Sequence, residues 1–169
     1  MNESRPVVTL RLDEQRLVEF MALWRQLEDD NAGIHDGRCD KNKTSRRVHA
    51  EGFGGEYAFC KYNNICADFT TTPRKGGYDC LLHDRRFDVK AVAPGRNLVV
   101  SASKDYGECD YYALVICEYP KRYTIAGVAA KKDLLVPRRI NHNLPKPAYF
   151  MHQGELIPLC DFLRSIGSC

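Results

Sequence analysis

Hydrophobic residues recur at steps of three and four in two parts of the chain, the spacing of amphipathic helices. The first segment spans residues 14–29; it follows a short predicted strand at 7–12, and Asp13 is its expected N-cap. The second spans residues 44–62. The apolar positions of the first helix that we expect to face the core are Leu17, Phe20, Met21, Trp24 and Leu27.

Three glycines interrupt the second predicted helix, at positions 52, 54 and 55. Glycine weakens helix propensity, so these residues indicate either a break or a close approach of the backbone to a neighbouring element. Glu56 follows them directly. On a helix packed against a sheet this carboxylate either joins a polar site or lies in solvent, and periodicity alone does not separate the two readings.

The remaining apolar segments are short and end at Gly, Pro or polar turns, as strands do. Two of them, 78–83 and 87–92, predict a hairpin. Segment 111–119 is the most apolar, so we expect it at the centre of the sheet, with 123–130 as its antiparallel neighbour. Segment 66–72 is expected to be a strand or an irregular edge. Other expected elements are strands at 97–101 and 148–151 (a sheet edge), a helical turn at 131–136, a closing helix at 157–166 and a loop at 30–44.

These elements predict one α/β domain over residues 1–169, with a mixed central sheet flanked by helices. A hydrophobic fraction of 44% and a charged fraction of 28% are ordinary for a globular protein. The N-terminus has no signal-peptide core, and no apolar run approaches the ~20 residues of a membrane span, so we expect a cytoplasmic protein. The eight cysteines include no CxxC pair, which argues against structural zinc.

The predicted hairpin carries the candidate chemistry. Strand side chains alternate between faces, so Asp88 and Lys90 share one face while Val89 points to the other. Antiparallel pairing would bring Asp79 to the same patch. Two close carboxylates repel unless a proton or cation lies between them, and Mg²⁺ is bound by one or two carboxylates together with water and phosphate oxygens. The pattern indicates metal-assisted hydrolysis of a phosphodiester.

Glu56 on a helix, Asp79 on a strand and Asp88-Val89-Lys90 on the next strand resemble, in this order, the motif of the PD-(D/E)xK nuclease superfamily. The resemblance covers residues 45–130 and includes the apolar strand that follows the motif. Tyr78 stands where the family has a proline. The resemblance implies a restriction-endonuclease-like fold and a Mg²⁺-dependent deoxyribonuclease.

The resemblance also implies a role for each residue. Asp79 and Asp88, with the backbone carbonyl of Val89, would hold Mg²⁺ or Mn²⁺. Lys90 would orient the attacking water or stabilise the developing charge on the phosphate. Glu56 would assist the same ion through water or bind a second one. One such site per chain favours a homodimer if both strands of DNA are cut.

Three other readings remain open. In the first, Asp88 and Lys90 form an exposed strand ion pair that contributes little to stability. In the second, the chain is a non-catalytic nucleic-acid-binding or assembly module. In the third, it is a cysteine-dependent enzyme. A net charge of +3 permits a nucleic-acid partner without requiring one. The basic residues that would follow a phosphate backbone are Arg38, Lys41, Lys43, Arg46, Arg47, Arg85, Arg86, Lys121, Arg122, Lys131, Lys132, Arg138, Arg139 and Lys146.

Overall fold

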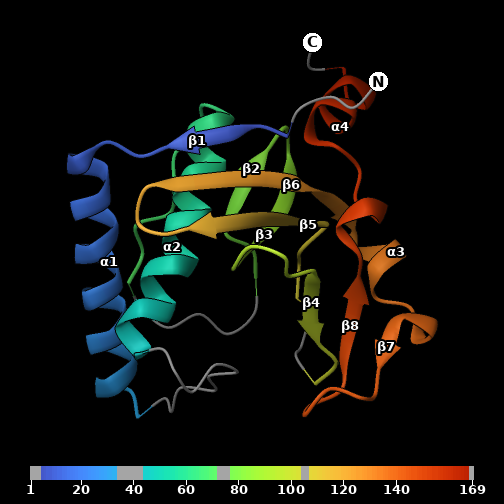
Figure 1. Ribbon diagram of the computed structural model, residues 1–169, viewed down its shortest axis with the longest axis horizontal. Coiled ribbons are helices and arrows are strands. Elements are labelled where there is room, and N and C mark those ends of the chain that lie inside the picture. Colours follow the sequence, from blue (N-terminus) through green and yellow to red (C-terminus); the bar gives the residue numbers. More distant parts are fainter. Residues whose placement is uncertain (1–4, 34–43, 72–76, 104–106, 168–169) are drawn as a thin grey trace.

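Two β-sheets and four α-helices make up the protein in the computed structural model, which describes residues 5–33, 44–71, 77–103 and 107–167 (Figure 1). The strands of the larger sheet lie in the order β1-β6-β5-β3-β2, and those of the smaller in the order β4-β8-β7. The fold is therefore mixed α/β, as predicted.

The elements have the following bounds. The larger sheet contains β1 (Val7–Thr9), β2 (Cys80–Leu82), β3 (Arg85–Val92), β5 (Tyr111–Glu118) and β6 (Arg122–Ala130), and the smaller β4 (Leu98–Ser101), β7 (Ile140–Asn141) and β8 (Ala148–Met151). The α-helices are α1 (Leu12–Asn31), α2 (Ser45–Tyr62), α3 (Lys131–Leu134) and α4 (Leu159–Ser165), and two short 3₁₀ segments are η1 (Pro137–Arg139) and η2 (Gln153–Glu155).

Strand β5 lies at the centre of the larger sheet, as its apolar sequence predicts. It pairs in parallel with β3 and antiparallel with β6. Ala113 and Val115 belong to a hydrophobic core shared with α1, α2 and α4, whereas Tyr112 and Leu114 belong to a second core shared with the smaller sheet and α3. A strand buried on both faces has no polar side, which explains its continuous apolar run.

A two-residue turn sets the register of the predicted hairpin. His83 and Asp84 have φ angles of 48° and 58°, the left-handed conformation that a type I′ turn requires at both central positions. Cys80 consequently lies opposite Phe87. The two strands are β2 and β3, so the hairpin prediction for residues 78–92 is confirmed, with shorter pairing on its first strand.

Helix α1 buries only part of the apolar face predicted for it. Met21 is buried and Leu17 packs partly buried against the core, as predicted. Phe20, Trp24 and Leu27 are exposed, Trp24 by 46%, and Val18, outside the predicted set, is buried instead. The reason is that α1 is an outer layer packed against α2, which covers only a narrow stripe of its surface (Figure 1). The N-cap is Arg11 rather than Asp13. No helix in the described part of the chain is both long enough and apolar enough to cross a membrane.

The edge-strand prediction for 148–151 is wrong, and so is the strand alternative for segment 66–72. Segment 148–151 lies between β4 and β7 in the smaller sheet and is not an edge strand. Residues 66–71, the described part of segment 66–72, form no strand. Both depend on pairing with distant residues, which local sequence does not reveal. Of the predicted loop 30–44, residues 34–43 lie outside the described residues, as do Arg38, Lys41 and Lys43.

Helix α2 lies unusually close to the sheet because of its glycines. A Cβ atom at Gly55 would lie 2.7 Å from the Ala91 Cβ on β3, and one at Gly54 would meet the ring of Tyr123 on β6. The helix is continuous from Ser45 to Tyr62, with the Thr44 side chain as its N-cap. The glycines therefore mark a close approach and not a break, and they bring the next residue, Glu56, close to the sheet.

We expect Gly55→Ala to destabilise the protein by about 1–3 kcal/mol, because the added methyl group overlaps Ala91 in a packed core. The matched control is Gly52→Ala in the same helix, where nothing lies within 4 Å of the added Cβ. There the gain in helix propensity should stabilise by roughly 0.5–1 kcal/mol. Urea unfolding of the two variants measures the difference; equal stability changes would show that the helix does not approach β3 this closely.

Candidate functional site

Asp88 is a buried carboxylate within β3, only 6% exposed. Its neighbours Phe87 and Val89 face the core beneath α2, so Asp88 and Lys90 point to the opposite face of the strand. There the Lys90 ammonium forms an ion pair and a hydrogen bond with Asp88 Oδ1. The pair is not the exposed surface pair that one of the alternatives supposes.

Asp79 is bonded to β3 on both sides of Asp88. Its backbone N–H donates to the Phe87 carbonyl at 2.7 Å, and its Oδ2 accepts a hydrogen bond from the Val89 N–H at 2.7 Å. Strand β2 begins only at Cys80, so no backbone carbonyl of β2 accepts this bond, and the Asp79 carboxylate accepts it instead. These bonds fix Asp79 beside Asp88 at the open edge of β3.

The Val89 backbone also faces this edge. In a strand, the N–H and C=O groups of one residue point toward the same neighbour. Because the Val89 N–H meets Asp79, its carbonyl oxygen faces the side on which Asp79 lies. The three predicted metal-binding groups therefore lie on two neighbouring segments: Asp79 just before β2, and Asp88 with the Val89 carbonyl on β3.

Glu56 lies on α2 and is held by a cation. The Arg25 guanidinium of α1 pairs with Glu56 Oε2 at 3.0 Å. Arg25 is itself fixed, since it donates to the Asp68 carbonyl at 3.1 Å and lies 4.6 Å from the centre of the Phe53 ring. Glu56, the fourth predicted site residue, thus forms its ion pair with Arg25 of α1. It still lies close enough to Asp79 for its charge to raise the pKa of that residue.

The charges of these groups influence one another. Burial, followed by the negative charges of Glu56 and Asp88, raises the pKa of Asp79 from 3.8 to about 7. Burial alone would lower the pKa of Lys90, but the charge and hydrogen bond of Asp88 outweigh it and raise that pKa above its ordinary value. Lys90 is therefore protonated at neutral pH, and the cluster retains more negative charge than Lys90 neutralises.

The donor atoms suit a hard divalent cation. Two carboxylates and one peptide carbonyl are oxygen ligands of the kind Mg²⁺ uses, and Mg²⁺ keeps several waters besides. Within the described ranges, no group of three or more His, Cys, Asp or Glu side chains is arranged to hold a metal ion. A site built on Asp79 and Asp88 would therefore have no third carboxylate ligand in this arrangement, which agrees with the ion pair of Glu56 with Arg25.

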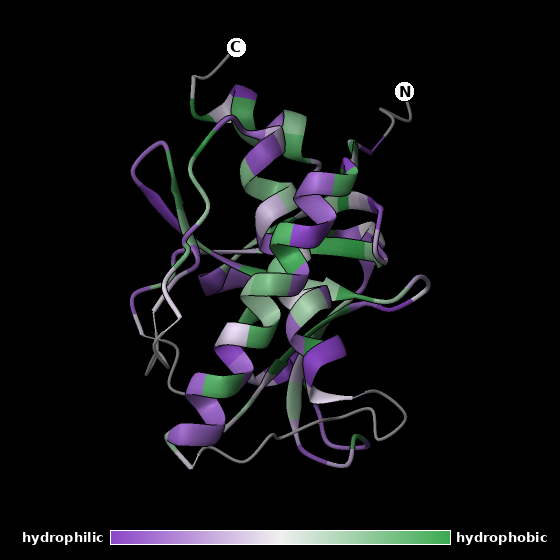
Figure 2. Cartoon of the chain, turned by 90° about the vertical axis from the view of Figure 1, so that its left-hand side faces the viewer, coloured by the Kyte–Doolittle hydropathy of each residue, from purple (hydrophilic) through white to green (hydrophobic). Residues whose placement is uncertain are grey.

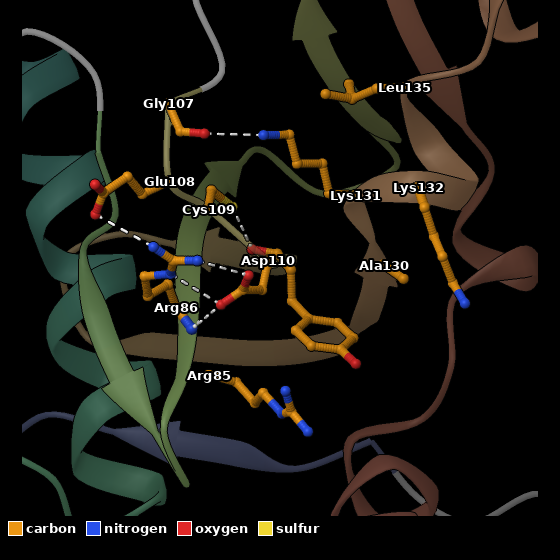
Figure 3. Close-up of a pocket in the computed structure, with 11 residues that line it drawn as sticks. Arg85, Arg86, Gly107, Glu108, Cys109, Asp110, Ala130, Lys131, Lys132 and Leu135 are labelled. Atoms are coloured by element: carbon orange, nitrogen blue, oxygen red, sulfur yellow. Dashed lines mark hydrogen bonds and ion pairs between the residues drawn. The ribbon is translucent and has the colours of Figure 1, made fainter.

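A basic pocket of about 630 Å³ lies where β3 and β5 begin and β6 ends (Figure 3). Arg86 is held there by Asp110, at 3.0 Å and 3.1 Å, and by Glu108 at 3.2 Å. Arg86 also lies two residues before Asp88, so both project from the same face of β3. The cations that line the pocket are Arg85, Arg86, Lys131 and Lys132.

Sequence reasoning missed two residues of this region. Arg25 lies on the polar side of an otherwise apolar helical pattern, and nothing in its neighbourhood indicates that it binds Glu56 on another helix. Asp110 directly precedes the apolar segment 111–119 and fixes Arg86, and only the parallel pairing of β3 with β5 brings the two together.

No family model, no characterised protein and no solved structure matches this chain. The resemblance to the PD-(D/E)xK nucleases therefore depends on the motif residues alone. The mixed α/β fold is observed, whereas its restriction-endonuclease-like subtype remains a prediction.

The raised pKa of Asp79 makes stability depend on pH. Because its folded pKa, about 7, exceeds the unfolded value, folding is favoured at low pH and this advantage is lost as the pH rises from about 4 to about 7. Asp79→Asn removes this loss and keeps an acceptor for the Val89 N–H. At 1.36 kcal/mol per pKa unit, the variant should gain roughly 2–3 kcal/mol relative to the wild type between pH 5 and pH 8.

Urea unfolding of both proteins at pH 5, 6, 7 and 8 measures this gain. A difference in free energy of unfolding that stays constant over this range would contradict the proposed electrostatic environment of Asp79.

Proposed function

We propose that this chain is a metal-dependent nuclease that hydrolyses phosphodiester bonds in DNA. The observation that carries the proposal is the buried Asp88 carboxylate beside Lys90, with Asp79 bonded to β3 on both sides of it. A cluster with two neighbouring acids and one lysine is costly to bury, and such a cost is typical of active sites.

Asp79, Asp88 and the Val89 carbonyl would hold Mg²⁺ or Mn²⁺. When bound, the ion polarises the scissile phosphate and lowers the pKa of a coordinated water. The hydrogen bond from the Val89 N–H to Asp79 Oδ2 fixes the orientation of the Asp79 carboxylate. The burial of Asp88 limits the access of bulk water that would compete for the ion. The protein thus fixes its ligands before any ion arrives, which reduces reorganisation during the reaction.

Lys90 acts as a hydrogen-bond donor and a positive charge in this proposal. Its raised pKa keeps it protonated, so it does not accept the proton of the attacking water. An ammonium group at this position orients that water or stabilises the negative charge that develops on the phosphate oxygens. Glu56 contributes through water, at a distance kept by Arg25.

The basic pocket supplies the support for DNA as substrate. Arg86 and Asp88 lie on one face of β3, so a phosphate backbone that crosses the pocket would pass toward the acidic cluster. Arg85 and Lys132 also line the pocket with positive charge, whereas Arg86 is largely neutralised by Asp110 and Glu108. Such contacts position the backbone without reading its sequence.

The alternative function is a nucleic-acid-binding or assembly module without turnover. The ion pair between Lys90 and Asp88 gives this alternative some support, since each group already compensates the charge of the other without a metal. The two functions differ in whether bound DNA is cut.

We expect the purified protein to cut supercoiled and linear DNA with Mg²⁺ or Mn²⁺ and to stop when EDTA is added. Asp88→Asn and Lys90→Met should each lower the cleavage rate by about 100-fold or more, because each removes charge from the reacting centre. The matched control is Glu118→Gln, which removes an exposed carboxylate at the far end of β5, paired with Arg122 at 3.4 Å. It should cut at the wild-type rate.

Urea unfolding establishes that each variant remains folded. Wild-type rates in both site variants would refute the proposed site. Salt-sensitive, metal-independent DNA binding without cleavage would select the alternative instead.

A further inference from the structure

An apolar stripe runs along the outward side of α1. Phe20, Leu23, Trp24 and Leu27 are 55%, 40%, 46% and 52% exposed, and their spacing places them on one side of the helix. The rings of Phe20 and Trp24 lie 5.8 Å apart, so the stripe is continuous there. Helix α1 is the outermost layer in Figure 1, and Figure 2 faces this side of the molecule.

The stripe is not needed for folding of the single chain. The opposite side of α1 already packs into the core beside α2, through Val18, Met21 and Ala22. A contiguous apolar surface that the fold leaves uncovered typically marks an interaction site.

Charges at the two ends of the stripe indicate what covers it. Arg16 lies seven residues before Leu23 and Asp30 lies seven residues after it, which is two helical turns in each direction. Both are exposed. Among the residues that the structure describes, neither side chain forms an ion pair.

This arrangement is self-complementary about Leu23. In an antiparallel pair of α1 helices with a two-fold axis at Leu23, Arg16 of each copy meets Asp30 of the other. The same symmetry places Leu23 against its own copy and brings Phe20 to within one residue, about 1.5 Å along the helix axis, of Leu27. A parallel pair would instead place like charges together, which is unfavourable.

We propose that a second copy of this chain binds the outward face of α1, forming a symmetric antiparallel dimer. An interface of this kind uses the same patch on both subunits. The stripe from Arg16 to Asp30 spans only about 21 Å at 1.5 Å per residue. One helix pair of that length buries less than a standard interface, so the dimer dissociates readily on dilution. The inference does not depend on the nuclease activity.

Charge exchange tests the register directly. The full chain, the single variants Arg16→Asp and Asp30→Arg, and the double variant are compared by analytical ultracentrifugation over about 1–200 µM, the range for a weak complex. We expect the wild type to dimerise, each single variant to bind itself at least 10-fold more weakly, and the double variant to regain wild-type affinity. The matched control is Arg122→Asp, an exposed charge reversal on β6, which should dimerise normally.

Fluorescence provides a second readout at the stripe itself. Trp24 is the only tryptophan in the chain, so its emission should shift to shorter wavelength as the wild type is concentrated, and not in the single variants. A wild type that stays monomeric throughout the range would overturn the proposal. So would a dimer whose affinity the single variants leave unchanged, or a double variant no tighter than the singles.

Discussion

The buried ion pair between Asp88 and Lys90 is the constraint on which the site depends. A carboxylate inside a sheet loses its hydration and is tolerated only with a partner, here the Lys90 ammonium. Such pairs seldom stabilise a fold more than apolar residues of similar size would. Asp79 adds a second carboxylate whose pKa is raised to about 7. The cluster is therefore better explained by a chemical role, as in the proposed nuclease, than by its contribution to folding.

Backbone geometry brings this cluster together. The type I′ turn at His83 and Asp84 fixes the hairpin, and the Asp79 bonds to β3 continue it beyond the last regular pair. The close contact of Gly55 with Ala91 brings α2, and with it Glu56, near the same strand. Arg25 then holds Glu56 from α1. Four separate segments are thus held together by one local turn and by mutually consistent contacts between distant residues.

Local pattern predicted the parts of the fold that local physics decides. The spacing of hydrophobic residues over 44–62 and the apolar run of β5 predicted a helix and a central strand, and the D-x-K spacing predicted two charges on one face. Trp24 was misassigned because periodicity identifies an apolar side of a helix but not the element that covers it. The smaller sheet and the bond between Arg25 and Glu56 depend on long-range contacts, which no short segment of sequence contains. For the same reason, periodicity does not show that the outward stripe of α1 is exposed to solvent.

The central claim is that Asp79 and Asp88 together bind a divalent ion. Its most direct test is anomalous diffraction at the manganese edge from crystals soaked in Mn²⁺, for the wild type and for Asp88→Asn. The account predicts one peak in contact with both carboxylates in the wild type and none in the variant. A wild-type crystal without a peak, in which Lys90 is still paired with Asp88 and the Val89 N–H is still bonded to Asp79, would contradict it.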